Sequence, residues 1–406
     1  MRFFKLKDLL FFAALGTRLL AGIWLGHFSA PAVWEPEVIA NNLLAGKGFL
    51  LNDHLGTSYR AFMLPAYPVL CAFVYSFTRH SQPAVLLLQC LLSALSCLQI
   101  RAIGEQVFKK SKAGTVAAWL TAFHPGLVFF ATQLHPLTLD LFSYLWTLWA
   151  CLALFERPGT ARALHLGIAA GFALLSRGTI LFFLLFSAAL FLWRAGREGW
   201  LGKGARLAAL AVSVAALAVL PWLARNALLF KRFPLFITSS NQSLWAGNNP
   251  LSVGTLHSRD GRPLINQLPV HLETALAQSD ELGQSDLFRK EAWAFIRQDP
   301  WAAARLYLRK WVNFWWFSPT TGRYYPPVYA IAYGLCYAVA ALLAVAGLWS
   351  VRRQISSPPI LLLVLFPLFI ALFQCLYYVE GRHRWTVEPL LLLLAARGTQ
   401  IKCASS

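Results

Sequence analysis

The apolar residues of this chain fall in long runs separated by short polar stretches. A helix that crosses a bilayer needs roughly 20 mainly apolar residues, and inside lipid its backbone must satisfy its own hydrogen bonds. The runs therefore predict spanning helices, and no alternating pattern suggests a barrel. We place the spans at residues 9–28, 84–100, 115–132, 137–155, 164–175, 180–193, 207–224, 328–349, 359–379 and 387–396.

Two longer polar sections, 29–83 and 225–326, interrupt this pattern. Within the first, residues 63–77 are apolar but contain Pro65 and Pro68, and cations flank them on one side only. We interpret 63–77 as a re-entrant or interfacial helix. The predicted fold class is an all-α polytopic membrane protein with a bundle of about ten transmembrane helices and interfacial helices in the first outer loop.

Three parts follow from this division of the chain. Residues 1–224 form a transmembrane module that includes the first outer loop at 29–83. Residues 225–326 form an extracytoplasmic segment with amphipathic helices. Residues 327–406 form C-terminal transmembrane helices with a short cytoplasmic tail.

Composition supports a membrane protein, because 58% of the 406 residues are hydrophobic and only 13% are charged, too few for a soluble domain. The net charge of +19 could suggest nucleic-acid binding, but the cations are distributed as a topology signal. Short loops on one face hold only Lys47, Arg60, Arg79, Arg177, Arg382 and Arg384, whereas the other face holds Arg2, Lys5, Lys7, Arg101, Lys109, Lys110, Lys112, Arg157, Arg162, Arg194, Arg197, Lys203, Arg206, Arg352, Arg353, Arg397 and Lys402.

The positive-inside rule assigns the cation-rich face to the cytoplasm. If 63–77 were a full span, the cluster at 109–112 would lie outside, so the rule also favours the non-spanning interpretation. We predict a multi-pass protein of the plasma (inner) membrane with cytoplasmic termini and an extracytoplasmic active face. Membrane lipids are expected partners, and nucleic acid is not.

Helix signals mark the end of the second outer section. Asp299-Pro300 is an N-cap followed by Pro in the first turn, and Asp286 is a candidate cap for a helix through Phe295. The helix that begins at Pro300 combines basic and aromatic residues, which favours docking at the membrane over substrate contact. Its members are Trp301, Arg305, Arg309, Lys310, Trp311, Trp315 and Trp316.

Carboxylates are few, so each candidate can be weighed. Asp140 lies near the outer end of a span, where an ionised group is costly enough to indicate function; Glu388 is similar but shallower. Glu35 and Glu37 lie in the first turn of a short helix with Pro36 at its start and Gly46 after its end. Acids in a first turn also simply complement the helix dipole, so a structural role is the alternative.

Six motifs follow one another along the chain. They are Trp34-Glu-Pro-Glu-Val-Ile-Ala-Asn-Asn-Leu-Leu-Ala-Gly-Lys-Gly-Phe49, Tyr59-Arg60 with Pro65-Ala66-Tyr67-Pro68, Ser176-Arg177, Pro221-Trp-Leu-Ala-Arg225-Asn226, Leu244-Trp-Ala-Gly-Asn-Asn-Pro250, and Gly381-Arg382-His383-Arg384 through Glu388-Pro389. Together and in this order they resemble motifs of GT-C-fold glycosyltransferases of the protein O-mannosyltransferase and aminoarabinose transferase branch.

The resemblance implies an enzyme that moves a hexosyl or pentosyl group from a polyprenyl-phosphate donor to an extracytoplasmic lipid, glycan or protein. It implies an inverting single displacement, with a carboxylate as base and arginines on the donor phosphate. The phosphate-binding candidates are Arg60, Arg177, Arg225, Arg382 and Arg384. The substrate-pocket candidates are Asn41, Tyr59, Tyr67 and His383. Some related enzymes use a divalent metal, but no metal site is recognisable in this sequence.

The chain departs from the family pattern at two positions. The family's leading acid falls at Ala32, and its tyrosine falls at Pro36. Glu35 is therefore the first candidate for the base and Glu37 the second, while Asp140 could supply the missing carboxylate.

Each candidate also has a structural interpretation. Arg177 could anchor a tight hairpin at the interface, Arg225 could cap its helix, and Arg382 and Arg384 could pair with Glu380. His124 and His135 are expected to be satisfied structural groups. The seven cysteines show no metal spacing and no disulfide framework, so we expect small inert hydrophobes.

Two other functions remain open from sequence. A transporter could use Arg18 and Asp140 along a polar path, although the chain lacks repeated halves. A non-catalytic lipid-binding or assembly subunit is the second alternative, because of the missing acid at Ala32.

Overall fold

The computed structural model describes residues 2–52, 57–109, 111–233, 236–318 and 327–400. Nearly all of the regular structure in these residues is helical, and one small antiparallel sheet pairs β1 (Leu51–Asn52) with β2 (Ser58–Tyr59). The predicted all-α fold class is confirmed.

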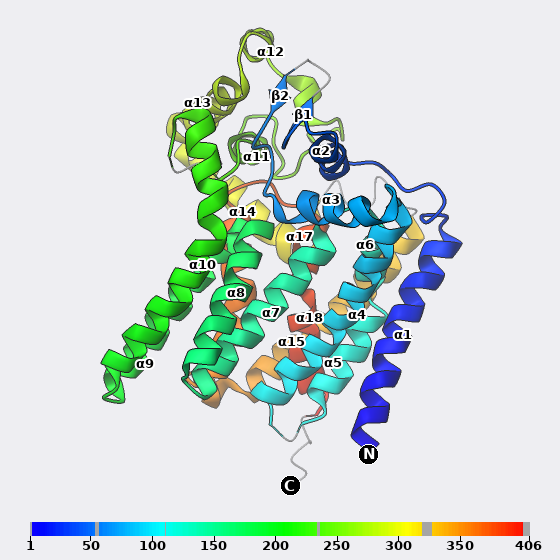
Figure 1. Cartoon of the computed structure of the whole chain (residues 1–406), viewed down its shortest axis with the longest axis vertical. Coiled ribbons are helices and arrows are strands. Elements are labelled where there is room, and N and C mark those ends of the chain that lie inside the picture. Colours follow the sequence, from blue (N-terminus) through cyan, green and yellow to red (C-terminus); the bar gives the residue numbers. More distant parts are fainter. Residues whose placement is uncertain (1, 53–56, 110, 234–235, 319–326, 401–406) are drawn as a thin grey trace.

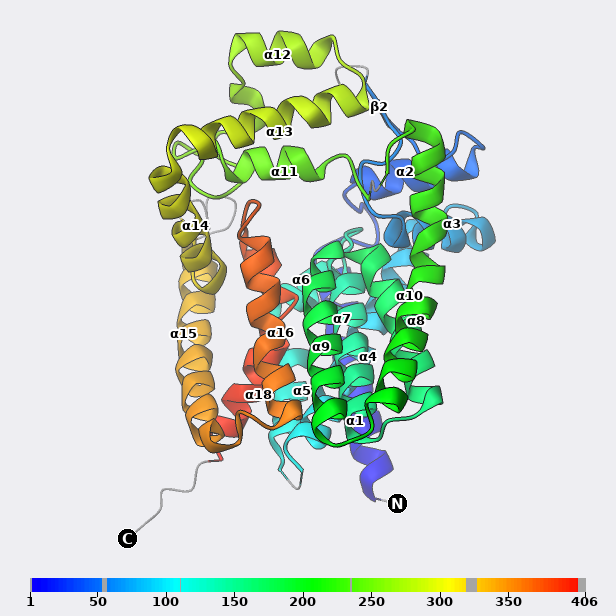
Figure 2. The same ribbon diagram turned by 90° about the vertical axis from the view of Figure 1, so that its left-hand side faces the viewer.

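A bundle of roughly parallel and antiparallel helices forms the body of the protein (Figures 1 and 2). Its helices are α1 (Arg2–Trp24), α4 (Gln82–Val107), α5 (Ala113–Ala122), α6 (Pro125–Ala131), α7 (Leu137–Glu156), α8 (Thr160–Ser176), α9 (Leu181–Arg197), α10 (Leu201–Phe230), α15 (Pro327–Ser350), α16 (Pro358–Gln374) and α18 (Glu388–Gly398). Each predicted span coincides with one of these helices or with the pair α5–α6.

Five helices of the described chain are long and apolar enough to cross a membrane: α4, α7, α9 with the 3₁₀ turn η1 (Gly178–Ile180) before it, α10 and α15. The bent pair α5–α6 would make a sixth. Helices α8 and α16 are apolar but shorter, at 17 residues each.

The predicted span 115–132 is broken, because α5 and α6 meet at an angle of 56°. Pro125 lacks the N–H that would continue the helix. The carbonyls freed at the end of α5 are satisfied by Arg18 of α1, which donates to Ala122 O at 2.7 Å and Thr121 O at 3.4 Å. This buried arginine therefore stabilises a helix break.

One end of the bundle is covered by shorter elements, and we call it the loop end. There α2 (Glu35–Leu44) and α3 (Ala66–Thr78) lie across the ends of the spanning helices (Figure 1). Helix α3 exposes Phe73 and Phe77 and buries Cys71 and Tyr75. This position agrees with the non-spanning interpretation of residues 63–77.

The second polar section also lies at the loop end. It contains α11 (Ser240–Gly247), the 3₁₀ turn η2 (Leu264–Gln267), α12 (Val270–Ala277), α13 (Glu281–Gln298) and α14 (Pro300–Trp315). Helix α13 crosses over the bundle, and α14 leads from it toward α15 (Figure 2). Helix α10 runs to Phe230, beyond the predicted membrane boundary at residue 224.

One predicted helix start in this section is confirmed and another is wrong. Asp299 caps α14 by accepting from Ala302 N at 2.8 Å. Helix α13 begins earlier than predicted, because Asp280 caps it by accepting from Gly283 N at 2.8 Å. Asp286 lies inside α13 instead and pairs with Arg232 and Arg289.

A buried carboxylate ties the two polar sections together. Glu281, in the first turn of α13, accepts from the backbone N–H groups of Arg60 at 2.6 Å and Ala61 at 2.9 Å. It also accepts from the Thr238 hydroxyl at 2.6 Å. Loss of the Glu281 carboxylate would leave these three donors without an acceptor, which is costly for buried groups. Glu281 therefore holds the first loop against the start of α13.

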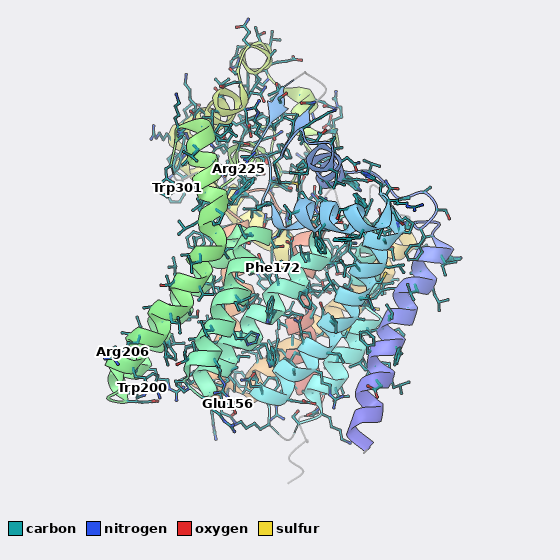
Figure 3. The ribbon with its side chains drawn as sticks, viewed as in Figure 1. Glu156, Phe172, Trp200, Arg206, Arg225 and Trp301 are labelled. Atoms are coloured by element: carbon teal, nitrogen blue, oxygen red, sulfur yellow. The ribbon has the colours of Figure 1, made fainter. Side chains whose placement is uncertain are left out.

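The labelled residues show which parts of the chain lie at each end of the bundle. Arg225 and Trp301 lie at the loop end, whereas Glu156, Trp200 and Arg206 lie at the other end (Figure 3). Helix α1 begins and α18 ends at that other end (Figure 1). Two short elements complete the described chain. The 3₁₀ turn η3 (Arg352–Gln354) lies between α15 and α16, and the short helix α17 (Gly381–Trp385) precedes α18.

Candidate functional site

Asp140 and Arg177 form an ion pair at the loop end of α7 and α8. Arg177 Nε lies 2.7 Å from Asp140 Oδ2, and the Ser176 hydroxyl donates to Asp140 Oδ1 at 2.6 Å. Asp140 is 1% exposed, whereas the Arg177 side chain is 22% exposed. Both oxygens of the carboxylate thus accept a hydrogen bond, and the ion pair holds the partly exposed guanidinium at the ends of α7 and α8.

The short helix α17 brings a second arginine to the same end. Arg382 Nη2 lies 3.2 Å from Glu380 Oε2 and 3.4 Å from the Tyr378 hydroxyl. The predicted pair between Arg382 and Glu380 is therefore present. The Arg382 side chain is 26% exposed, so the ion pair with Glu380 leaves the guanidinium accessible to a ligand.

Two histidines lie beside these arginines. His383 is buried in α17, and its ring packs against Tyr378 with centroids 5.2 Å apart. His135, in the bend between α6 and α7, packs against Phe130 at 4.9 Å, and Phe130 in turn contacts Trp385 of α17 at 5.4 Å. Ring contacts thus connect His135 to the helix that carries His383.

The charges of this group act on one another. Burial lowers the pKa of His383 well below its ordinary value, and the charges of Arg177 and Arg382 lower it further. Burial and the same two arginines lower the pKa of His135. Burial opposes the charge of Arg382, but Glu380, Tyr378 and Glu35 raise its pKa. The imidazoles are therefore neutral and the guanidiniums charged.

We call this group the loop-end cluster. It comprises Asp140, His135, Arg177, Tyr378, Glu380, Arg382 and His383. It contains two charged guanidiniums and two neutral imidazoles, which are all hydrogen-bond donors suited to an anion such as a phosphate.

Glu35 and Glu37 have opposite environments although they share the first turn of α2. Glu35 is exposed, no partner for its carboxylate occurs in the described chain, and its charge acts on Arg382. Glu37 is 4% exposed and accepts a hydrogen bond from Gln82 at the start of α4. Glu35 is thus available to a ligand beside the cluster, whereas Glu37 joins α2 to α4.

Arg60 and Arg225 form a separate cationic group. Arg225 donates to the Arg60 carbonyl at 2.8 Å and lies over the rings of Trp222 and Phe49, at 4.9 and 5.6 Å from their centroids. Arg60 is exposed. These two arginines lie where β2 meets the loop end of α10, and within the described residues neither contacts Arg177 or Arg382.

Arg384 differs from the other arginine candidates because it is fully buried. It pairs with Glu388 at 3.1 Å and donates to the Trp316 carbonyl at 2.7 Å and the Tyr333 hydroxyl at 3.1 Å. Its donors already have partners, which favours a structural role over phosphate binding.

The other pocket candidates are spread over the first loop. Asn41 is exposed on α2, Tyr59 bonds to Gln284 of α13, and Tyr67 is buried and bonds to Gln89 of α4. His383 alone among these candidates lies in the loop-end cluster.

Neither a disulfide nor a metal-binding group occurs among the described residues. The six described cysteines are free, and Cys403 lies outside the described residues. No three His, Cys, Asp or Glu side chains in the described ranges come together as they would around a metal ion.

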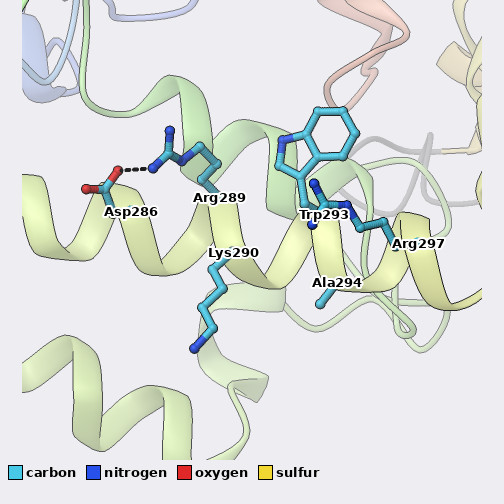
Figure 4. Close-up of a pocket in the computed structure, with 6 residues that line it drawn as sticks. All are labelled: Asp286, Arg289, Lys290, Trp293, Ala294 and Arg297. Carbon is cyan, nitrogen blue, oxygen red and sulfur yellow. Dashed lines mark ion pairs between the residues drawn. The ribbon is translucent and has the colours of Figure 1, made fainter.

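A shallow surface pocket of about 510 Å³ lies on α13 (Figure 4). Its lining consists of Asp286, Arg289, Lys290, Trp293, Ala294 and Arg297. None of the candidate site residues lines it, and all six lining residues come from one helix. We therefore place the candidate site at the loop-end cluster and not in this pocket.

Sequence reasoning missed part of the cluster. His135 was expected to be structural, and Tyr378 was not singled out. Both lie within a few residues of a candidate, since His135 precedes Asp140 and Tyr378 precedes Arg382. Polar residues near the ends of successive predicted spans were the available signal.

Comparison with known proteins supports the resemblance seen in the motifs. Residues 64–224, about two fifths of the chain, match the sequence model described as dolichyl-phosphate-mannose-protein mannosyltransferase. This part of the chain resembles a glycosyltransferase family. The match spans α3 to α10 and includes Asp140 and Arg177 of the loop-end cluster.

Two solved structures of ArnT from Cupriavidus metallidurans are also similar. The chain has 14% identity and a TM-score of 0.42 to the apo form, covering 94% of this chain and 76% of that one. It has 13% identity and a TM-score of 0.46 to the form bound to undecaprenyl phosphate, covering 98% and 76%. No curated protein matches the chain.

Proposed function

We propose that the chain is a membrane glycosyltransferase that moves a sugar from a polyprenyl-phosphate donor to an acceptor at the loop end. The observation that supports this most strongly is the exposed carboxylate of Glu35, which has no partner among the described residues and whose charge acts on Arg382 of the loop-end cluster. A free carboxylate beside charged guanidiniums offers a base and a phosphate site together.

The proposed reaction is a single displacement. Glu35 accepts the proton of the acceptor hydroxyl, and the acceptor oxygen bonds to the anomeric carbon as the bond from that carbon to the phosphate oxygen breaks. The electron pair of the broken bond stays on the phosphate, which leaves as polyprenyl phosphate. Arg177 and Arg382 stabilise its charge, and attack opposite the phosphate inverts the anomeric carbon.

Asp140 has a supporting role in this proposal. Both of its oxygens already accept hydrogen bonds, from Arg177 and Ser176. It therefore orients Arg177 rather than acting as the base. Arg60 and Arg225 lie outside the cluster and are proposed to contact the more distant parts of the substrates.

The sidedness is part of the proposal. The short loops at the loop end carry few cations, and by the positive-inside rule this supports a position of that end outside the cytoplasm, at the plasma (inner) membrane. Transport along Arg18 and Asp140 receives no support, since Arg18 bonds to backbone carbonyls and Ser93 and Asp140 bonds to Arg177.

The test is incubation of the purified full-length protein with a panel of polyprenyl-phosphate sugars and mixed envelope acceptors. We expect release of free polyprenyl phosphate from at least one donor, and we expect release to depend on the acceptor. Absence of release from every donor, by protein that binds undecaprenyl phosphate, would refute transferase activity.

A further inference from the structure

The two histidines of the loop-end cluster are held in the same way. His135 Nδ1 accepts from the backbone N–H of Leu137 at 3.1 Å, and His383 Nδ1 accepts from the backbone N–H of Glu380 at 3.1 Å. A backbone N–H can only donate, so each Nδ1 must carry a lone pair. In a neutral imidazole the single proton is then on Nε2.

Both Nε2–H groups are thus donors, and neither has a partner in the described parts of the chain. Arg177 contacts Asp140 through Nε, which leaves its two terminal nitrogens for a ligand. Arg382 uses Nη2 for Glu380 and Tyr378. The cluster therefore keeps donors from two imidazoles and two guanidiniums that have no hydrogen-bond acceptor among the described residues.

The charges around the imidazoles explain how neutral donors can contribute to the binding of a phosphate. The two guanidinium charges are matched by Asp140 and Glu380. The charges of Arg177 and Arg382 act on both histidines, and Tyr378 packs against His383. Asp140, Glu380 and Glu35 act on these arginines. Because the cations are already paired, additional fixed N–H donors strengthen the binding of a phosphate without requiring another charge.

We propose that His135 and His383 are phosphate-binding residues that donate from Nε2–H to the phosphate of the donor lipid and of the released polyprenyl phosphate. This inference rests on the proposed function and gives His135, which the sequence predicted to be structural, a ligand-binding role. The backbone bonds to Nδ1 are the positioning device, because they fix both the tautomer and the direction of each ring.

Two substitutions at each histidine separate ligand binding from structure. In His→Asn, the amide oxygen replaces Nδ1 and can still accept from the backbone, but the donor at the Nε2 position is lost. In His→Gln, the amide nitrogen reaches the Nε2 position and can donate, but the backbone N–H loses its acceptor. His135→Asn, His135→Gln, His383→Asn and His383→Gln form the set.

Binding of undecaprenyl phosphate to the full-length protein in detergent is measured by calorimetry, together with thermal unfolding of each variant. We expect each Asn variant to bind roughly tenfold more weakly than the wild type, and each Gln variant to retain more binding despite a lower unfolding temperature. Inorganic phosphate serves as a second probe, and it shows whether the phosphate alone is sufficient for binding.

The opposite order would overturn the inference: Asn variants that bind like the wild type, with Gln variants impaired, would show purely structural histidines. That result leaves the proposed function intact if the wild type binds undecaprenyl phosphate. If the wild type does not bind it, the proposed function itself fails.

Discussion

The loop-end cluster and a second group, which we call the buried quartet, use the same residue types in opposite ways. The quartet comprises Arg384, Glu388, Tyr333 and His124. Glu388 lies 3.1 Å from Arg384 Nε and 3.1 Å from His124 Nε2, and Tyr333 donates to it at 2.8 Å. Arg384 also lies over the ring of Tyr337, at 3.8 Å from its centroid.

The two groups differ in how many hydrogen-bond donors remain without a partner among the described residues. In the quartet, the arginine and the carboxylate have protein partners on all sides, and both are almost completely buried. In the loop-end cluster, Arg177 and Arg382 remain partly exposed and each histidine keeps one donor. An arginine near a histidine and a glutamate is therefore not by itself a site; unsatisfied donors beside an accessible carboxylate are what favour one.

The largest expected effect lies in the quartet. Arg384→Gln leaves Glu388 buried without its cation, and we expect a loss of about 3–5 kcal/mol in the free energy of unfolding. The measurement is thermal unfolding of purified protein in detergent, with Arg352→Gln as a control at an exposed arginine. A stable Arg384→Gln variant with weakened lipid binding would instead move Arg384 into the site.

In the loop-end cluster, substitution is expected to affect ligand binding more than stability. Arg382→Gln removes one charged donor, and its partner Glu380 is partly exposed and can remain solvated. We expect about tenfold weaker binding of undecaprenyl phosphate and a change in unfolding free energy below about 1 kcal/mol. If Arg382→Gln binds undecaprenyl phosphate like the wild type but loses much of its stability, Arg382 has a structural role like that of Arg384.

A smaller effect is expected from pH. The pKa of His135 and of His383 is lowered in the folded protein, so each binds a proton less readily there than in the unfolded chain. Falling pH therefore favours the unfolded chain once it passes the ordinary histidine value of 6.5, and stability is retained above that value.

The unfolding temperature, measured between about pH 8 and pH 5, should fall at the acid end. The fall should be smaller in the double variant His135→Asn/His383→Asn, because its two side chains do not titrate. Equal acid sensitivity in the double variant and the wild type would mean that other groups control the loss.

Much of the fold could be predicted from the sequence, because helix length and apolar composition follow directly from the thickness of a bilayer. The positions of the apolar helices and of the non-spanning helix at 63–77 were predicted in this way. The break at Pro125 was missed, since its stability depends on Arg18, which reaches the freed carbonyls from a helix about 100 residues away in the sequence.

The site was less predictable, because charge alone does not show which partner satisfies each group. Arg177 and Arg384 look alike in sequence, yet Arg384 donates to the carbonyl of Trp316, about 70 residues away. Glu35 and Glu37 are two residues apart, and only packing against Gln82 separates them. His135 belongs to the cluster because of the bend before α7, and its position near the end of a predicted span was the only signal in the sequence.

The most direct test of the account compares Glu35→Gln with Glu37→Gln in an assay for the release of polyprenyl phosphate from a sugar donor. The account predicts that Glu35→Gln lowers the rate by about 10²–10⁴-fold, as expected for loss of a general base, while binding of undecaprenyl phosphate is retained. Glu37→Gln should keep most of the activity. Full activity in Glu35→Gln, or equal losses in both variants, would contradict the assignment of the base.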